Sequence, residues 1–274
     1  MQLKLAAIVV LYHPPENVVE NIHTYATYTD RIYLINNSSV QTILFPDSWK
    51  NKLTIINNDD NYGVAKALNQ GMQLAIKDGF EWVMTMDQDS SFGKHKINNY
   101  LHQVIQHQQE KIAMYGPGYG NSIAANTESI QVNRMITSGA IINTKAYIKT
   151  GPFNEQLFID EVDHEYCYRL RLLNYTLMQF PSIQMEHRLG EKGNSKLTES
   201  RSFHSPIRLY YMIRNGLWII KKYRAQFPVE TSRTRKDILI RIKNNLFFGQ
   251  QKWQCLHYIL KGIIDYRKNK FGKL

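Results

Sequence analysis

Two carboxylates one residue apart follow an apolar run in the stretch VMTMDQDSSF, residues 83–92. Asp87 and Asp89 would repel each other, and one would be driven toward protonation unless a cation held both in the charged form. A hard divalent ion such as Mg²⁺ binds one or two carboxylates together with the phosphates of a substrate. The simpler alternative is that strands end in loops and loops carry aspartate, so the pair alone does not establish a metal site.

The aspartate pair follows the last of four apolar runs that are typical of buried strands. These runs cover residues 5–11, 32–35, 53–56 and 82–86. Before the fourth run, the segment GVAKALNQGMQLAIKDG repeats apolar or small residues with a period of about 3.6, which predicts a helix that Gly79 ends. Strands that alternate with helices predict right-handed crossovers and a mostly parallel α/β sheet.

Polar residues follow each of the four predicted strands. They are His13, the turn at 36–39, the loop at 57–63 and the two aspartates. Ligands of open α/β sheets bind beyond the carboxyl ends of the strands. We therefore expect these four segments to meet at one rim of the sheet and to form a binding site there.

Length and composition limit the class of protein. The 274 residues suffice for one large domain, or for a domain with an extension. Cys167 and Cys255 are far apart and outside any metal-ligand spacing, which favours a reducing cytoplasm. The first residues are predicted to form a strand and not a signal peptide, and no apolar run reaches the roughly 18 residues of a membrane-spanning helix.

The positive charge is concentrated in the last third of the chain. Residues 1–187 hold 14 Lys and Arg against 18 Asp and Glu, while residues 188–274 hold 20 against 5. Such a basic segment suits a polyanionic partner, either nucleic acid or an anionic membrane, or it is a solvated face without a partner. Ser205 and Pro206 are predicted to begin a helix, and residues 236–266 to form one or two amphipathic helices that pack on the domain or lie on a membrane.

Several short motifs, taken in order, resemble one known family. They are VVLYHPP (9–15), NNSS (36–39), NYGVAKALNQG (61–71), MDQDSS (86–91), TSGA (137–140), FIDEVDHEYCYRLR (158–171), EHRLGE (186–191) and RLYYMIRN (208–215). Each is weak alone, but their order and spacing together resemble the inverting family 2 glycosyltransferases of the GT-A fold, in the rhamnosyltransferase branch. The resemblance spans nearly the whole chain and implies a GT-A domain over residues 1–200, followed by a basic helical extension over residues 201–274.

The resemblance implies a metal site and a general base. Asp87 and Asp89 match the D-x-D motif that holds Mg²⁺ or Mn²⁺ on the donor diphosphate, with Asp89 on the metal and Asp87 toward the ribose or sugar. His187 matches a histidine that completes this site in many members, although a histidine after a strand is otherwise an ordinary surface residue. Asp163 matches the general base, with Asp160 and Glu165 as rivals; Glu165 could equally form a helical ion pair with Arg169.

The resemblance also implies a nucleotide-sugar pocket. Asn61, Gly63 and Asn69 match its N-x-G-x-A-x-A-x-N pattern, and the expected donor-binding set from the same rim is completed by His13, Asn36, Asn37, Asp87 and Gly139. The simpler alternative for Gly139 is a turn glycine. Asn36 departs from the family's usual aspartate, and because asparagine both donates and accepts hydrogen bonds, the identity of the base is left open.

Arg214 lies in an apolar helical segment, where a charged side chain needs a partner. Its partner is either a diphosphate, of the donor or of a lipid-linked acceptor, or a carboxylate such as Glu186.

The implied activity is transfer of L-rhamnose from dTDP-rhamnose to a growing cell-surface polysaccharide, with a polyprenyl-diphosphate-linked glycan as acceptor. The expected location is cytoplasmic, on the inner face of the membrane and held by anionic lipid. The main alternative is a UDP-hexose donor on the same fold. A nucleic-acid-binding protein leaves the polar rim unexplained, so no nucleic acid partner is expected, and a non-catalytic sugar-nucleotide-binding partner is disfavoured because every expected acid is present.

Overall fold

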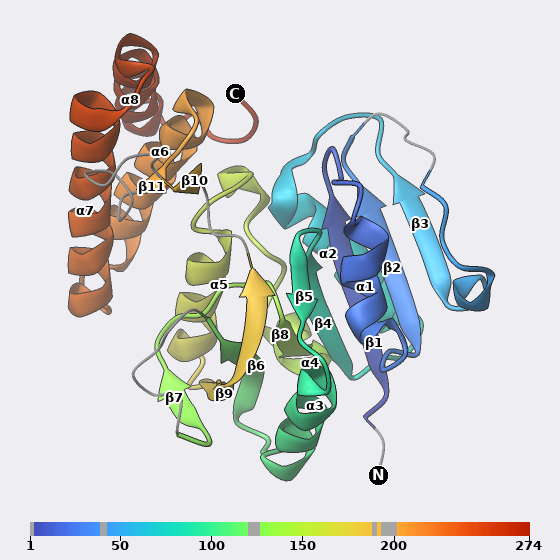
Figure 1. The fold of residues 1–274 in the computed structure, drawn as a ribbon. Helices are drawn as coiled ribbons and strands as arrows, with labels where there is room; N and C mark the ends of the chain where they lie inside the picture. Colours follow the sequence, from blue (N-terminus) through green and yellow to red (C-terminus); the bar gives the residue numbers. More distant parts are fainter. Residues whose placement is uncertain (1–2, 39–42, 120–126, 188–190, 193–201) are drawn as a thin grey trace. The chain divides into compact units, whose positions relative to one another are not determined.

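The computed structural model describes residues 3–38, 43–119, 127–187, 191–192 and 202–274, except for the side chains of residues 187, 191, 192 and 202 (Figure 1). The chain divides into two compact units. The sheet unit holds residues 1–154 and 166–188, and the helical unit holds residues 155–165 and 189–274. The domain boundary predicted at 200/201, like Ser39 and residues 188–190 of the motifs, lies outside the described residues.

A nine-stranded sheet forms the centre of the sheet unit, in the order β3-β2-β1-β4-β8-β6-β9-β5 with β7 beside β9. Its strands are β1 (Leu5–Leu11), β2 (Arg31–Asn36), β3 (Leu53–Asn57), β4 (Trp82–Asp87), β5 (Ser90–Phe92), β6 (Ile112–Gly118), β7 (Ile130–Val132), β8 (Ala140–Asn143) and β9 (Thr176–His187). The first four strands pair in parallel, as the sequence predicts. In the other half β8 runs antiparallel to both β4 and β6, so the sheet as a whole is mixed.

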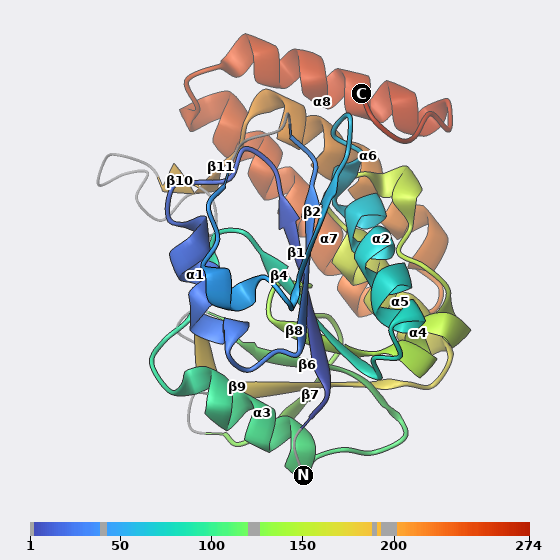
Figure 2. The same ribbon diagram turned by 90° about the vertical axis from the view of Figure 1, so that its right-hand side faces the viewer.

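The helices of the sheet unit cover both faces of the sheet. They are α1 (Val18–Ala26), α2 (Gly63–Lys77), α3 (Lys96–Gln106), α4 (Thr144–Thr150) and the later part of α5 (Val162–Leu172). Figure 2 shows α1 and α2 on opposite sides of β1 and β2. A fully buried strand is apolar on both faces, and β1 meets this condition because Leu5 and Val9 join the core cluster of α1 while Ile8 faces α2.

The close approach of α2 to the sheet depends on Gly71. A Cβ atom at this position would lie 2.6 Å from Ile8 Cγ2, well inside van der Waals contact. The glycine therefore brings α2 near β1 and β2, and with it the N-terminus of α2 near the carboxyl ends of these strands.

The helical unit is built on three helices, α6 (Pro206–Tyr223), α7 (Pro228–Lys243) and α8 (Lys252–Arg267). A π-helical turn, Asn244–Phe248, lies between α7 and α8. The strands β10 (Glu191–Lys192) and β11 (Ser202–Phe203) form a short antiparallel ribbon. Ser205 caps α6 by accepting a hydrogen bond from the Arg208 amide, as predicted. The helices α7 and α8 pack on α6 around a core cluster that contains Leu209, Ile213, Ile238, Cys255 and Ile259.

Candidate active site

The carboxyl ends of the four parallel strands lie in register at one rim. Asn36, the last residue of β2, pairs with Leu11 of β1 and with Asn57 of β3, and Asp87 of β4 pairs with Val10. The structure thus brings together the ends of the four strands that the sequence placed on a common rim. This edge is where α/β sheets bind their ligands.

Asn36 is the centre of a hydrogen-bond network at this rim. Its Nδ2 donates to Asn57 Oδ1 at 3.0 Å, and its Oδ1 accepts from the Ser38 amide at 3.0 Å and from the Ser38 hydroxyl at 2.6 Å. The side chain is 5% exposed. Asparagine therefore uses both of its hydrogen-bonding capacities here, whereas the aspartate usual in the family could only accept.

A second amide network joins the turn after β2 to α2. Asn37 donates to the Gly63 carbonyl and accepts from Asn58, and Asn58 exchanges two hydrogen bonds with Gln70. Asn61 accepts from the Gly63 amide, whose residue has a φ of 82° that glycine adopts readily. The sequence analysis did not single out Asn58 or Gln70, and the only signal available was the run of asparagines from residue 57 onward.

Gln88, the middle residue of the D-x-D motif, ties two loops of the rim together. Its Oε1 accepts from the Tyr12 amide at 2.8 Å, and its Nε2 donates to the Tyr12 carbonyl at 2.9 Å. Asn21 also donates to the Gln88 carbonyl. The middle position of the motif therefore has a positioning role: it holds the aspartate turn against the segment that carries His13.

Asp87 and Asp89 are both half-buried. The Asp87 amide donates to the Ser138 hydroxyl, which in turn donates to the buried Ser90 hydroxyl. Burial, and secondarily the negative charge of Asp87, raise the pKa of Tyr25 well above its usual value, so this phenol stays neutral. The groups described near Asp87 are thus the neutral Tyr25 phenol and the hydrogen-bonded hydroxyls of Ser138 and Ser90.

Residue 187 lies beside the aspartate turn. In the antiparallel pairing of β5 with β9, His187 is the partner of Ser90, which directly follows Asp89. The His187 side chain is outside the described residues, and within these residues no three His, Cys, Asp or Glu side chains gather as a metal-binding group. The ligand role of His187 stays a prediction that this register favours.

His13 and Gly139 lie on loops of the sheet unit. His13 is exposed, has a φ of 45° and contacts the Tyr12 ring edge-on. Gly139 has a φ of 76°, and a Cβ there would lie 2.7 Å from Met185 Sδ and 2.8 Å from Pro117 Cγ. The Met185 and Pro117 side chains therefore lie against this glycine, and its contact with the donor stays a prediction.

Asn69 is placed inside the sheet unit. It is 1% exposed, donates to the Phe153 carbonyl, and accepts from the Tyr147 hydroxyl and the Phe153 amide. Its motif predicts a contact with the nucleotide, but these hydrogen bonds favour a structural role, in which Asn69 fixes the segment after α4 to α2.

Three carboxylates that compete for the role of general base lie close together in the helical unit. Asp160 pairs with Arg208 at 3.2 Å, and burial raises its pKa although the Arg208 charge opposes this. Glu165 is buried, accepts from the Tyr223 hydroxyl at 2.7 Å and pairs with Lys222 at 3.4 Å. Asp163 is half-buried and accepts from the His164 amide, and no Lys or Arg of the described residues pairs with it.

The segment that carries these acids is held by Arg214 and Asn215 of α6, both 0% exposed. Asn215 Nδ2 lies 2.9, 2.7 and 3.0 Å from the carbonyl oxygens of Leu157, Ile159 and Asp160. Arg214 Nε donates to Asn215 Oδ1 and so orients that amide. Sequence analysis missed Asn215, although a buried amide next to a buried arginine is an unusual pair in an apolar helix.

The Arg214 guanidinium donates to carbonyl oxygens of Gly272, Leu157 and Gln156 and to the Tyr210 hydroxyl. It also lies about 5 Å from the ring centres of Tyr210, Tyr211 and Phe271. Within the described residues none of these partners is a carboxylate, and the Arg214 side chain itself is fully buried. The hydrogen bonds of this arginine go to carbonyl groups of the protein and to the Tyr210 and Asn215 side chains, and not to Glu186, while its contact with a diphosphate stays a prediction.

The held segment has an unusual backbone. Phe158, Asp160 and Glu161 have φ values of 66°, 63° and 62°. Non-glycine residues adopt this region at a cost, and they persist there only where the surroundings fix them. The hydrogen bonds of Arg214 and Asn215 to the carbonyls of residues 156–160 provide that fixation directly before Asp163.

We expect Asn215→Ala to lower the free energy of unfolding by about 2–3 kcal/mol, because the carbonyls of Ile159 and Asp160 lose this donor and that of Leu157 loses one of its donors. Urea unfolding followed by circular dichroism measures this change. Gln254→Ala removes an exposed amide from α8 of the same unit and should leave the midpoint unchanged. An Asn215→Ala midpoint equal to that of the wild type would show that the amide does not stabilise this segment.

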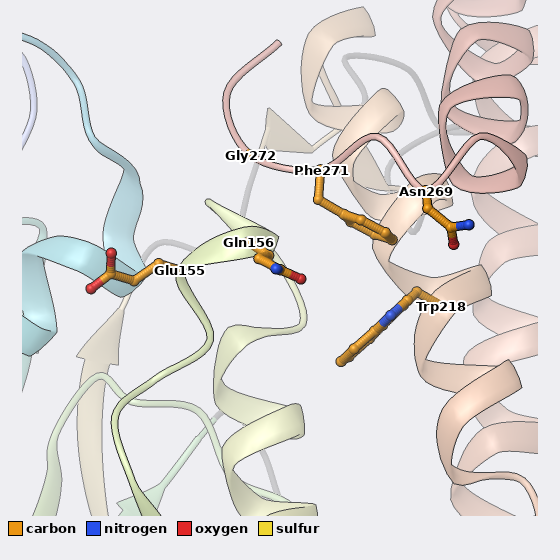
Figure 3. Close-up of a pocket in the computed structure, with 6 residues that line it drawn as sticks. All are labelled: Glu155, Gln156, Trp218, Asn269, Phe271 and Gly272. Carbon is orange, nitrogen blue, oxygen red and sulfur yellow. The ribbon is translucent and has the colours of Figure 1, made fainter.

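An open hollow of about 620 Å³ adjoins the same segment (Figure 3). It is lined by Glu155, Gln156, Trp218, Asn269, Phe271 and Gly272. In Figure 3 the Gln156 side chain extends toward Trp218 and Phe271, while that of Glu155 points away. Arg214 bonds the carbonyls of Gln156 and Gly272, so one buried guanidinium joins two of the lining segments.

His204 should make the protein sensitive to acid. Burial, followed by the charges of Arg241 and Arg208, lowers its pKa to about 4. Because the folded state then binds fewer protons than the unfolded state between about pH 6.5 and pH 4, stability is lost as the pH falls through this window. The ring is part exposed, so we expect a loss of only about 1 kcal/mol.

The measurement is the thermal unfolding midpoint between pH 7.5 and 4.5 for the wild type and for His204→Gln. The variant should lose less stability on acidification than the wild type. His257→Gln, at an exposed histidine of α8, is the matched control. Equal acid sensitivity of His204→Gln and wild type would contradict the expected role of this ring.

Comparisons with known proteins agree with this architecture. The sequence profile of the family described as Glycosyl transferase family 2 matches residues 7–159. The dTDP-rhamnosyl transferase RfbF of Shigella flexneri is 28% identical over 291 residues, which cover 96% of this chain and 94% of that protein.

Solved structures also resemble the chain. S. aureus TarS 1–349 in complex with UDP-GlcNAc superposes with a TM-score of 0.58 at 14% identity, covering 96% of this chain and 80% of that one. GalNAc-T7 with UDP, GalNAc and Mn²⁺ superposes with a TM-score of 0.61 at 11% identity, covering 96% and 55%. At such identities the likeness is one of fold.

Proposed function

Because the chain belongs to glycosyl transferase family 2, we propose that this glycosyltransferase moves L-rhamnose, with inversion, from dTDP-rhamnose to a growing cell-surface polysaccharide. The observation that carries the proposal is the rim: amide networks around Asn36 and Asn37 at one end and two carboxylates at the other lie along the edge where α/β sheets bind ligands. The relative named a dTDP-rhamnosyl transferase, which aligns over 96% of this chain, supports the choice of donor.

The rim offers distinct groups to the parts of a sugar nucleotide. We assign the base to the amide networks of Asn36 and Asn37, with Asn61 and Gly63 in the adjoining loop and His13 on the next one. The N-terminus of α2, which begins at Gly63, is a favourable place for phosphate because its free amides and dipole attract anions. The sugar and diphosphate would then lie toward Asp87, Asp89 and Gly139.

The residues present fit a divalent metal. Asp87 and Asp89 provide carboxylate oxygens, the ligands that Mg²⁺ and Mn²⁺ accept, and residue 187 lies beside them through the pairing of Ser90 with His187. We propose that Asp89, Asp87 and His187 hold the ion. When bound, it would neutralise the charge that develops on the leaving diphosphate.

Asp163 is the proposed general base. In an inverting transfer the acceptor hydroxyl oxygen forms a bond to C1 of rhamnose as the bond from C1 to the diphosphate oxygen breaks and dTDP leaves. The hydroxyl proton passes to the Asp163 carboxylate at the same time. Among the three candidate acids, Asp160 and Glu165 are each paired with a cationic side chain, which supports the choice of the half-buried Asp163.

We further propose that the acceptor is a glycan on a polyprenyl diphosphate, reached from the cytoplasmic side of a membrane. The 20 Lys and Arg against 5 Asp and Glu of residues 188–274 support attraction to anionic lipid, at roughly 1 kcal/mol for each basic residue near the surface. Within the described residues, no helix combines the length and the apolar character that crossing a membrane requires.

A UDP-hexose donor is the second candidate, favoured by Asn36. The family usually has an aspartate at this position, which can only accept hydrogen bonds, whereas Asn36 both donates and accepts them. The nucleotide base that binds here can therefore differ from the base that the family usually binds. A galactosyl-, glucosyl- or N-acetylglucosaminyltransferase on this fold would use the same rim and the same acids.

A donor panel tests the proposal. The protein is incubated with Mg²⁺ or Mn²⁺ and with dTDP-rhamnose or the common UDP- and GDP-sugars, and both slow release of nucleoside diphosphate and the thermal shift are followed. A response to dTDP-rhamnose alone is the expected result. A response to a UDP-sugar instead would overturn the rhamnose assignment and point to Asn36 as its cause, while no response to any donor would contradict the enzymatic proposal.

A further inference from the structure

One face of α8 keeps apolar side chains in solvent. Trp253, Leu260 and Ile264 are 84%, 50% and 48% exposed, and with the exposed His257 they recur at positions i, i+4, i+7 and i+11, which lie on one side of a helix. The opposite side of α8 supplies Cys255 and Ile259 to the core cluster with α6. The helix is therefore apolar on two sides, and only one of them is used by the fold.

Large apolar side chains are also exposed on α7 and on the π-helical turn. Leu239 and Ile240 are 60% and 53% exposed, and Phe247 and Phe248 are 69% and 42% exposed. We call Phe247, Phe248 and Trp253, which lie in the π-helical turn and at the adjoining start of α8, the corner surface. A monomeric protein rarely leaves so many large apolar side chains of neighbouring elements in water without a partner.

The backbone of the π-helical turn is held by hydrogen bonds of Asn245 and by a glycine that follows the turn. Asn245, 2% exposed, donates to the Arg241 carbonyl and accepts from the His204 amide. A Cβ at Gly249 would lie 2.4 Å from the Asn245 carbonyl oxygen, so only glycine fits after the turn. The backbone that carries Phe247 and Phe248 is thus held by Asn245 before them and by the close packing of Gly249 after them.

Basic residues surround the corner surface. Residues 228–268 hold nine Lys and Arg against three Asp and Glu, and Lys236, Lys243 and Lys252 among them are exposed on α7 and at the start of α8. Exposed Trp and Phe beside Lys and Arg are the combination that binds the interface of an anionic bilayer, with rings among the headgroups and cations on the lipid phosphates.

We propose that the corner surface inserts into the headgroup region of an anionic lipid bilayer, with Phe247 and Trp253 as its deepest side chains. The inference rests on the proposed lipid-linked acceptor and names the residues that would hold the enzyme on the membrane. A second copy of the chain fits this surface less well, because two surfaces of like positive charge would repel each other. Nucleic acid would leave Leu239, Ile240, Leu260 and Ile264 uncovered.

Vesicle sedimentation of the full chain tests the proposal. The probes are vesicles of phosphatidylcholine alone and vesicles with about a third of phosphatidylglycerol, at low and at high NaCl. The double variant Phe247→Ser/Trp253→Ser removes the two most exposed aromatic rings of the corner. The matched control is Leu44→Ser/Ile148→Ser, which removes side chains that are 84% and 62% exposed in the sheet unit.

We expect the wild type and the control to sediment with the anionic vesicles in a salt-dependent manner, and the corner variant to partition about tenfold more weakly or worse. The thermal shift with dTDP-rhamnose should be the same for all three proteins, so that loss of the membrane contact is distinguished from failure of the proposed function. Three results would overturn the proposal: no binding of the wild type to either vesicle, equal partition of the corner variant, or a dimer or an oligonucleotide complex that the corner variant abolishes.

Discussion

Asp163→Asn is expected to lower kcat by about 10²–10⁴-fold while leaving the affinity for the donor unchanged. The amide cannot take the acceptor proton, but it has nearly the same shape and keeps an oxygen that can accept from the His164 amide, which Asp163 Oδ1 does at 2.8 Å. The variant should therefore fold as the wild type does. Initial rates with dTDP-rhamnose and acceptor give kcat, and titration calorimetry with dTDP gives the affinity.

The two neighbouring acids provide matched controls. Asp160→Asn loses the charge that pairs with Arg208, and Glu165→Gln keeps an acceptor for the Tyr223 hydroxyl. Both variants should keep most of the activity, because these two carboxylates already form ion pairs with Arg208 and Lys222. A loss in Asp160→Asn as large as that predicted for Asp163→Asn, with full activity in the latter, would move the base to Asp160.

Asp89→Ala should abolish the metal dependence of donor binding and lower activity by about a hundredfold or more, because the diphosphate then loses the ion that neutralises it. The direct readout is Mn²⁺ binding by electron paramagnetic resonance, with and without dTDP. In the wild type the two ligands should strengthen each other's binding, and in the variant this coupling should vanish.

Asp47→Ala is the control for Asp89→Ala. Asp47 is an exposed carboxylate in the short 3₁₀ helix Asp47–Trp49 of the same unit, and its removal changes the net charge equally. It should leave Mn²⁺ binding intact. Equal Mn²⁺ and dTDP coupling in wild type and Asp89→Ala would exclude Asp89 as a ligand and leave Asp87 as the candidate.

The parallel half of the fold could be predicted from the sequence. The apolar run at residues 5–11 matches the bounds of β1, and the helical period from residue 64 matches α2 within one residue at its start. Buried parallel strands are continuous apolar runs that a sequence shows clearly. Because polar loops follow the ends of these runs, the position of the rim could be predicted as well. The expected α/β fold, the membership of family 2 and the glycosyltransferase class are confirmed by the comparisons.

The mixed half of the sheet could not be predicted in the same way. The strand β8 begins at Ala140, after a turn that includes Gly139, so the motif TSGA spans a turn and the first residue of a strand. The strands β5 and β7 are three residues long, which is too short for any period to show. Their pairing with β9 is decided by distant residues that no local pattern reveals.

Polar residues were the least predictable part of the site. Asn69 and Arg214 belong to the motifs, yet both form hydrogen bonds with backbone and side-chain groups of the protein itself. Asn215 and Gln88 hold the segments on which the candidate acids lie, but an asparagine or glutamine beside a motif residue gives no signal of its partner. A motif therefore indicates that a position matters without showing whether it touches the ligand.

The chain passes between the two units three times, after residues 154, 165 and 188. The carbonyls that Asn215 binds come from residues 157–160, some fifty residues earlier in the chain. A chimera that exchanged everything from Pro206 onward between two relatives would therefore pair one parent's Arg214 and Asn215 with the other parent's segment 155–165. A chimera should fold and act only where residues 155–165 and the helix with Arg214 and Asn215 come from the same parent. We therefore expect these two distant stretches to vary together during evolution.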